Sequence, residues 1–183
     1  MQRRQFIQLA AVSSLAAATT ANSSELPLTV SQQEGPFYPV QPIPDSNNLL
    51  LSPQHHGTEL LLSGRVLNRS GKPLANARVE IWQCDGRGIY QHPSGPGHTS
   101  FDKHFRGFGA TTTDNNGKYQ FVTIVPVPYT GRPPHIHTKV FTDNKEQLTS
   151  QIYLRDNRGH DQLKIDLVKI SNAIFTANFD FVI

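Results

Sequence analysis

Apolar and polar residues alternate over short runs along most of the chain beyond residue 58. The clearest run is 175–181, where apolar residues occupy every odd position and polar residues every even position. Successive side chains of a strand point to opposite faces, so this period of two predicts a half-buried strand. Similar runs predict six further strands, at residues 59–67, 78–83, 118–124, 135–141, 148–154 and 163–169.

Turn-forming residues separate these runs. Two clear examples are 68–71, which reads Asn-Arg-Ser-Gly, and 114–117, which reads Asp-Asn-Asn-Gly. Hardly any segment has the 3.6-residue period of an amphipathic helix. We therefore predict an all-β fold, an antiparallel β-sandwich with long loops, as a single domain over residues 59–183.

Two stretches do not fit the strand pattern. Residues 22–58 contain prolines at positions 36, 39, 42, 44 and 53, which forbids a long helix and predicts an extended Pro-rich N-terminal arm. The second stretch, roughly residues 85–109, holds six glycines together with His92, His98 and His104. Loops of this length in a compact domain are usually functional or disordered, so we predict that it forms the rim of a site. Its histidines, like His160, are expected to be solvated.

Residues 1–21 have the pattern of a signal peptide. Adjacent Arg3 and Arg4 are followed by Phe6, a weakly apolar run and small residues up to Ala21. The pattern is typical of a twin-arginine signal, although a plain secretory signal with a chance arginine pair is an alternative. We predict export, with a periplasmic location. The apolar run is too short to span a bilayer, so no stable membrane association is expected.

Charge and cysteine content exclude other classes of function. The net charge of +3 falls to +1 without Arg3 and Arg4, and the chain has no basic stripe interleaved with aromatics. Nucleic acid is therefore not an expected partner. Cys84 is the only cysteine, so no internal disulfide forms, and it is expected to be a small buried residue or a free thiol.

The residues around His135-Ile136-His137 carry the candidate chemistry. Residues i and i+2 of a strand share a face, so both imidazoles can reach one metal ion. Tyr129 lies just upstream and adds a phenol. Nitrogen and oxygen donors of this kind favour a hard, high-valent metal over the softer ions that thiolates select.

At this point the motifs carry a family resemblance. The chain resembles the intradiol catechol dioxygenases, most closely the protocatechuate 3,4-dioxygenase type of catalytic domain. The similar stretches cover nearly the whole chain after the signal, in order: 34–38 (EGPFY), 64–67 (GRVL), 77–83 (ARVEIWQ), 85–90 (DGRGIY), 113–119 (TDNNGKY), 123–129 (TIVPVPY), 132–137 (RPPHIH) and 151–153 (QIY).

The resemblance implies a metal, a ligand set and a reaction. The implied cofactor is one Fe(III) per active site, held by Tyr90, Tyr129, His135 and His137. Arg132 and Gln151 match the family's pocket arginine and glutamine, and together with Tyr129 they are the implied catalytic residues. The implied reaction inserts both atoms of O₂ into a catechol-type diol and cleaves the ring between the hydroxyl-bearing carbons, giving a cis,cis-muconate. A homo-oligomer is compatible with the sequence.

Three other classes of protein share parts of the pattern. A non-catalytic exported β-sandwich of the carboxypeptidase-regulatory type could contain residues 64–121, but it would not need the two tyrosines and two histidines together. A cupin usually has a Glu shortly after the second His, and residues 138–142 contain none. A zinc hydrolase would need a third histidine or a carboxylate.

Two departures from the family pattern bear on the substrate. Only Thr130 and Gly131 separate Tyr129 from Arg132, where the two-subunit enzymes carry a longer insertion, and Ala110 replaces a frequent arginine. We expect no counterpart here of the helical N-terminal domain that the catechol-specific relatives carry. The substrate is therefore left open among catechol, protocatechuate, hydroxyquinol and plant-derived diols.

Overall fold

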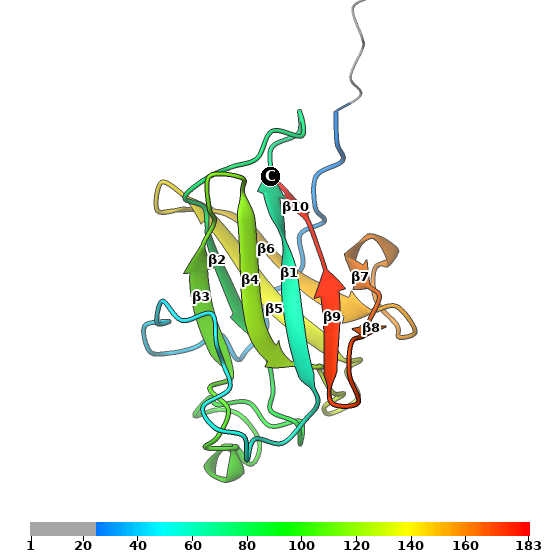
Figure 1. Cartoon of the computed structure of the whole chain (residues 1–183). Helices are drawn as coiled ribbons and strands as arrows, with labels where there is room; N and C mark the ends of the chain where they lie inside the picture. Colours follow the sequence, from blue (N-terminus) through cyan, green and yellow to red (C-terminus); the bar gives the residue numbers. More distant parts are fainter. Residues whose placement is uncertain (1–24) are drawn as a thin grey trace, which may run out of the picture.

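A computed structural model describes residues 25–183, and the predicted signal at residues 1–21 lies outside this range. The described residues form two β-sheets packed face to face, with almost no helix (Figure 1). Only two short 3₁₀ turns occur in this range, η1 (His98–Ser100) and η2 (Asp161–Leu163). Among residues 25–183, no helix has the length and apolar character needed to cross a membrane. The predicted all-β sandwich is confirmed.

The first sheet is centred on β1 (Glu59–Leu67). β4 (Lys118–Ile124) pairs antiparallel with one edge of β1. β9 (Ile174–Asn178) and β10 (Phe181–Val182) follow one another along the other edge, and β8 (Val168–Lys169) pairs with β9.

The second sheet carries the candidate metal ligands. Its strand order is β3 (Phe108–Thr112), β2 (Arg78–Trp82), β5 (His135–Thr142), β6 (Lys145–Leu154) and β7 (Lys164–Ile165). β2, β5 and β6 are antiparallel to their neighbours in this central part. The register pairs Trp82 with His137 and His137 with Gln151, so three side chains of interest lie in one row across the sheet.

The sheets are mixed, whereas the sequence pattern predicted purely antiparallel pairing. β1 pairs in parallel with β9 and β10, and β6 pairs in parallel with β7. Gly64 allows β9 and β10 to lie close along β1, because a Cβ at Gly64 would lie 1.8 Å from the carbonyl oxygen of Phe179. Strand direction depends on long connections through space, which local alternation does not report.

Most strand boundaries agree with the alternation, but β6 begins three residues before the predicted run 148–154, and the run 175–181 is divided between β9 and β10. Two further regions differ. The run 163–169 is split into the end of η2, β7 and β8, and the sequence pattern predicts no strand at β3, whose first two residues fall in the predicted rim loop. Gly109 weakens the strand signal of β3, yet it is needed there: a Cβ would lie 2.3 Å from the carbonyl oxygen of Ser46 in the arm.

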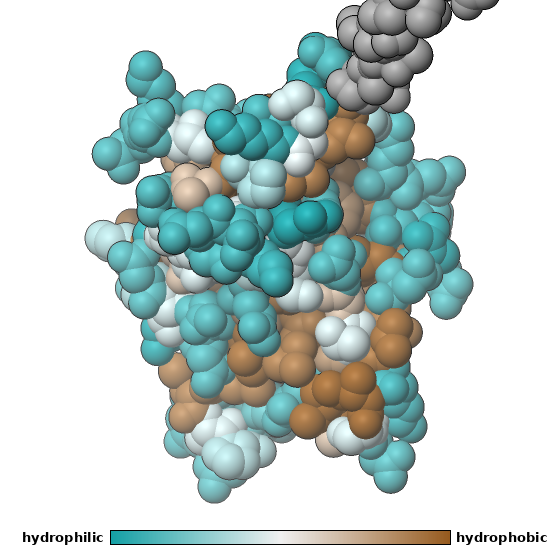
Figure 2. All heavy atoms as spheres, turned by 45° about the horizontal axis from the view of Figure 1, so that its top comes forward, coloured by the Kyte–Doolittle hydropathy of each residue, from teal (hydrophilic) through white to brown (hydrophobic). Residues whose placement is uncertain are grey.

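The core lies between the inner faces of the sheets. Its fully buried residues include Leu60 and Leu62 of β1, Ile81 of β2, Phe121 of β4 and Ile136 of β5. In residues 175–181 the odd positions face this core, as the alternation predicted. Figure 2 shows an outer face where polar and apolar residues are mixed, with apolar surface gathered mainly over its lower half.

Residues 25–58 run as an extended segment over the domain and contain only isolated β-bridges. The amide of Gln32 donates to the carbonyl oxygen of Thr149 at 2.9 Å, and the Ser150 hydroxyl donates to that of Val30 at 2.6 Å. These hydrogen bonds hold the segment along β6, beside the strand that bears the two histidines.

Candidate metal centre

The two histidines lie on one face of β5, as the sequence predicted. Their side chains are almost fully buried, with 1 % of His135 and 2 % of His137 exposed. The two Nε2 atoms are 3.1 Å apart. Nδ1 of His135 lies 2.6 Å from the carbonyl oxygen of Pro133, and donation there leaves Nε2 with a free lone pair.

The orientation of His137 is fixed by flat contacts on its ring. Its imidazole stacks on the indole of Trp82, with centroids 4.8 Å apart and planes 8° apart. Gly35 of the arm packs against it, since a Cβ at Gly35 would lie 3.2 Å from Cε1 of His137. Nδ1 of His137 is buried without a hydrogen-bond partner.

Tyr90 reaches the histidines from the loop that follows β2. Only 4 % of it is exposed. Its ring centroid is 5.0 Å from that of Tyr129 and 6.1 Å from that of His137. Its Oη atom is buried without a hydrogen-bond partner, which is costly for a phenol in an apolar surrounding. Phe37 of the arm covers the ring from the other side, at 4.8 Å.

Tyr129 and Arg132 are held by a tight turn. The two residues between them both have positive φ angles, +39° at Thr130 and +76° at Gly131, as a type I′ turn requires. The amide of Arg132 donates to the carbonyl oxygen of Tyr129 at 2.7 Å. The turn places the Tyr129 ring 5.6 Å from that of His135. The structure thus brings all four predicted ligands together.

Gln151 joins Arg132 to the sheet. Its Oε1 accepts hydrogen bonds from Nη2 of Arg132 at 2.8 Å and from the hydroxyl of Tyr153 at 2.7 Å. Its Nε2 donates to the carbonyl oxygen of Gln33 at 2.8 Å. Only 2 % of Gln151 is exposed, so these hydrogen bonds lie in the interior of the protein. The guanidinium is therefore fixed beside the tyrosines and histidines.

Burial sets the protonation of these groups. It lowers the pKa of His135 to about 4 and that of His137 well below its ordinary value, so both imidazoles are neutral at pH 7. Burial raises the pKa of Tyr90 and that of Tyr129, although Arg132 partly opposes the rise at Tyr129. Neutral imidazoles can bind a metal, and a trivalent cation bound beside them would supply the charge needed to ionise the phenols.

These observations are the test of whether a ferric ion fits. Two imidazoles and two phenols meet, one phenol oxygen is buried without a partner, and Nε2 of both rings point into the same space. Among residues 25–183, no group of three or more His, Cys, Asp or Glu side chains is placed to hold a metal. The side chains that do lie together offer imidazole nitrogen and phenol oxygen, a donor set that suits Fe(III).

The structure also defines the surroundings of three further residues near the site. Tyr38 anchors the arm: its hydroxyl donates to Glu80 at 2.8 Å, and its ring packs edge-on against Trp82 at 5.0 Å. Lys139 lies 2.6 Å from Glu34 and 2.9 Å from Glu146, so it is engaged by carboxylates. Cys84 is buried, and burial raises its pKa to about 12, which keeps the thiol protonated.

The expectation that His92 is solvated was wrong. It is buried, and its ring lies 5.7 Å from that of Phe37. His104 also has a defined partner, since its Nδ1 lies 2.8 Å from the hydroxyl oxygen of Ser52. Sequence reasoning also missed Tyr153, although the alternation of β6 places it on the same face as Gln151.

Comparison with known proteins gives a consistent result. A family model described as Dioxygenase matches residues 33–182. The protocatechuate 3,4-dioxygenase beta chain of Burkholderia cepacia is 37 % identical over 105 residues, which cover 53 % of this chain and 45 % of that protein. Catechol 1,2-dioxygenase 2 of Acinetobacter lwoffii is 34 % identical over 141 residues, covering 65 % and 48 % respectively. The chain thus spans about half the length of these curated relatives.

Solved structures show the same fold. The dioxygenase domain of a dioxygenase carbohydrate-binding protein fusion from Streptomyces sp. SirexAA-E aligns with a TM-score of 0.72 and 29 % identity, over 86 % of this chain and 98 % of that one. Catechol 1,2-dioxygenase from Acinetobacter sp. ADP1 aligns with a TM-score of 0.68 and 26 % identity, over 83 % and 61 %.

Proposed function

The chain belongs to the intradiol ring-cleavage dioxygenase family, and on that premise we propose that it is a non-haem Fe(III) enzyme acting on catechol-type diols. The reaction inserts both atoms of O₂ and cleaves the ring between the hydroxyl-bearing carbons, giving a cis,cis-muconate-type product. The convergence of two imidazoles and two phenols carries this proposal. A non-catalytic β-sandwich module is not favoured, because it has no use for this donor set.

Tyr90, Tyr129, His135 and His137 would hold the metal. When bound, Fe(III) stabilises the phenolates and activates the diol toward O₂ without an external reductant. The neutral imidazoles supply lone pairs from Nε2, and His135 is aimed by its hydrogen bond to the Pro133 carbonyl. The stacking of Trp82 on His137 and the close packing of Gly35 against the same ring keep the imidazole from rotating away.

The two tyrosines have different surroundings, which suggests different roles. Tyr90 is almost fully buried beneath Phe37, whereas Tyr129 is half-buried at the turn beside Thr130. Tyr129 is therefore the phenol that can swing aside, and its Oη is the atom that would take a proton from a hydroxyl of the substrate. Tyr90 stays in place.

Arg132 would stabilise the negative charge that builds up on the ring of the substrate. The hydrogen bond from its Nη2 to Gln151 fixes the guanidinium before the substrate arrives. A charge that is already in place stabilises a transition state without reorganisation during the reaction. Gln151 acts by holding Arg132, and Phe37 contributes apolar cover that keeps water from the tyrosines.

The test is a visible spectrum and an oxygen-uptake assay on purified, iron-loaded protein. We expect a red-brown colour from phenolate-to-iron charge transfer, a spectral change on addition of a diol, and uptake of one O₂ per diol without a reductant. Catechol, protocatechuate and hydroxyquinol form the first panel. A protein that stays colourless after loading with ferric iron would contradict the proposal.

Location and assembly extend the proposal. We propose that residues 1–21 are a twin-arginine-type signal and that the enzyme works in the periplasm, because that route carries folded proteins and suits a cofactor inserted before export. The proposed partners are the aromatic diol and O₂, with a homo-oligomer as one option. Fractionation of cells expressing the whole chain tests the location.

A further inference from the structure

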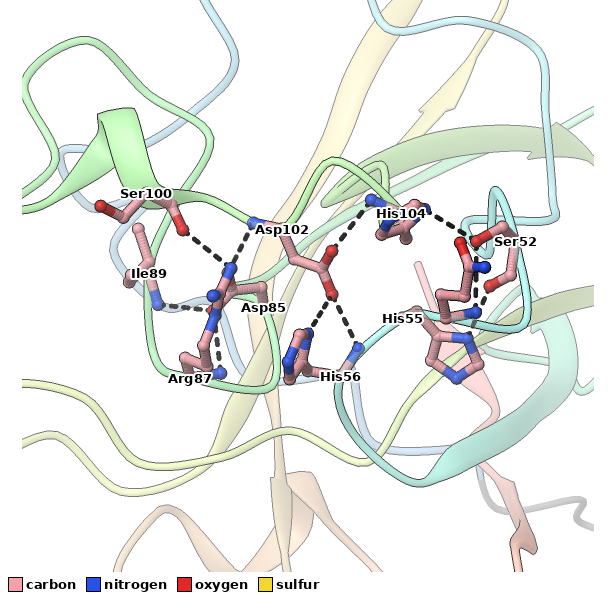
Figure 3. Close-up of polar contacts among 10 residues, drawn as sticks. Ser52, His55, His56, Asp85, Arg87, Ile89, Ser100, Asp102 and His104 are labelled. Carbon is pink, nitrogen blue, oxygen red and sulfur yellow. Dashed lines mark hydrogen bonds and ion pairs between the residues drawn. The ribbon is translucent and has the colours of Figure 1, made fainter.

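Two buried carboxylates lie outside the metal centre and take no part in the proposed reaction. Asp85 is completely buried and Asp102 is 3 % exposed, in the loop that connects β2 to β3. Buried acids are unusual unless several donors satisfy them. Figure 3 shows that both carboxylates are surrounded by N–H groups from the loop and from the arm.

Asp85 shapes the turn that leads directly to Tyr90. Its Oδ1 accepts the backbone N–H of Arg87 at 2.9 Å and that of Ile89 at 3.0 Å. Its own amide donates to the carbonyl oxygen of Ile89 at 2.8 Å. The residue immediately before Tyr90 is thus fixed by two hydrogen bonds to a single aspartate.

Asp102 ties this turn to the far end of the loop and to the arm. Its amide donates to Oδ2 of Asp85 at 2.9 Å, while its own Oδ2 accepts the backbone N–H of His56 at 2.7 Å and lies 3.0 Å from Nδ1 of that imidazole. Its Oδ1 accepts the backbone N–H of His104 at 2.9 Å. Arg87 closes the loop from the other side, since its Nη2 donates to the carbonyl oxygen of Ser100 at 2.8 Å.

The arrangement matters because Tyr90 lies in neither a strand nor a helix that would fix its position. The loop contains no strand between Trp82 and Phe108, and glycines flank Arg87 on both sides. A metal ligand must stay within a fraction of an ångström of its productive position. Carboxylates that accept buried N–H groups make strong, charge-assisted hydrogen bonds, so they can supply this rigidity.

We propose that Asp85 and Asp102 are positioning residues for Tyr90, through a hydrogen-bonded path that begins at His56 in the arm. The inference rests on the proposed ferric site and assigns no chemical step to either carboxylate. On this proposal, the affinity of the protein for ferric iron depends on a contact between residues 56 and 102. Apart from Tyr90, the proposed ligands lie far from both residues in the sequence.

The test is a double-mutant cycle read out as ferric-iron affinity. Asp102→Asn should lower iron affinity roughly 10- to 100-fold, the usual effect of losing a group that orients a ligand. In the Tyr90→Phe background the same substitution should cost less than about twofold, because its effect passes through Tyr90. Affinity is measured by competition with chelators of graded strength, and metal-free Tm is measured alongside.

Asp180→Asn is the matched control. Asp180 also accepts a backbone N–H, from Arg65 at 2.8 Å, and binds its guanidinium at 3.0 Å, at the end of β1. It should leave iron affinity unchanged. An Asp102→Asn effect that is equally large with and without Tyr90 would overturn the proposal, as would an effect on Tm alone.

His56→Ala covers the case in which Asp102→Asn does not fold. It removes the imidazole, whose side chain is 56 % exposed, but keeps the backbone N–H that Asp102 accepts. A several-fold loss of iron affinity that disappears without Tyr90 supports the proposal, and an unchanged affinity overturns it. A parent protein that binds no ferric iron overturns the proposed function as well, whereas a coloured parent with an additive cycle overturns the positioning role alone.

Discussion

The proposed metal centre combines two kinds of support. His135 and His137 lie on a central strand, and their relative placement follows from the strand period alone. Tyr90 and Tyr129 lie on loops, where backbone geometry has to be specified residue by residue. The imidazoles are held by cross-strand pairing and stacking, and the phenols by buried carboxylates and a turn with two positive φ angles. We therefore expect the two imidazoles to keep their positions when single supporting contacts are removed, and the two phenols to be displaced more easily.

The largest effect is expected when a strand-borne ligand is removed. His137→Ala should abolish the colour and lower iron affinity by more than the roughly 10- to 100-fold cost of losing a supporting residue. His160→Ala, at an exposed loop position, is the control and should match the parent. Iron content and visible absorption measure both. A His137→Ala protein that keeps its colour would show that the strand does not supply the second imidazole.

Removing Arg132 should come next and should separate chemistry from metal binding. We expect Arg132→Ala to lower kcat by about 100-fold, the typical cost of losing one preorganised donor, while iron content stays near that of the parent. Arg65→Ala removes a guanidinium that pairs with Asp180 and should leave kcat unchanged. An unaltered kcat in Arg132→Ala would remove the catalytic role from this residue.

The two loop-borne phenols should differ from one another. Tyr129→Phe should retain part of the iron but slow the substrate-induced spectral change by about 100-fold, the low end of the usual cost of losing a positioned proton acceptor. Tyr90→Phe should bleach the protein more strongly, since Tyr90 is the buried phenol. Stopped-flow absorption measures the first effect. Turnover as fast as in the parent would contradict the assignment of Tyr129 as the phenol that moves.

A smaller effect should follow from changing only the turn. Gly131 has φ +76° and open space around a Cβ, so Gly131→Ala should cost about 1 kcal/mol of backbone strain and should lower kcat a few-fold through Tyr129 and Arg132. Gly71→Ala is the control: Gly71 has φ +78° and the nearest atom is 3.7 Å away. Urea unfolding should show equal losses of stability, and only Gly131→Ala should lose activity.

The most gradual effect concerns acid. Burial alone raises the pKa of Asp102, but the N–H groups of His56 and His104 and the His56 imidazole lower it to about 2. A depressed pKa stabilises the folded state above the ordinary pKa near 4, and this contribution, roughly 2 kcal/mol, is lost as pH falls from about 4 toward 2. Urea unfolding of metal-free parent and Asp102→Asn should therefore differ at pH 7 and converge near pH 2.

The sequence predicts best those features that follow from the alternation of apolar and polar residues along a strand. The limits of β1 and β4, the shared face of His135 and His137, and the inward positions of residues 175–181 all follow from alternation. The assembly of Tyr90 with Tyr129 was expected only from family resemblance, because no local period relates residues 90 and 129.

Other features depend on contacts between distant segments and were beyond local patterns. The pattern predicts no strand at β3, where Gly109 fits closely against the Ser46 carbonyl of the arm. It also predicts a solvated His92, because the neighbour that covers this ring, Phe37, lies 55 positions earlier in the chain. The parallel direction of β9 against β1 likewise depends on a contact between distant segments and could not be predicted from local patterns.

The parallel pairing of β1 with β9 and β10 has a consequence for biosynthesis. The central strand of the first sheet meets its partner at residues 174–182 more than a hundred positions later, so one of its edges stays unpaired while the intervening chain is being made. Contacts between residues so far apart in the sequence slow folding. Until they form, the unpaired edge of β1 exposes backbone N–H and C=O groups that can pair with another chain. Closure of this edge by the last strands therefore sets the earliest moment at which the sandwich is complete.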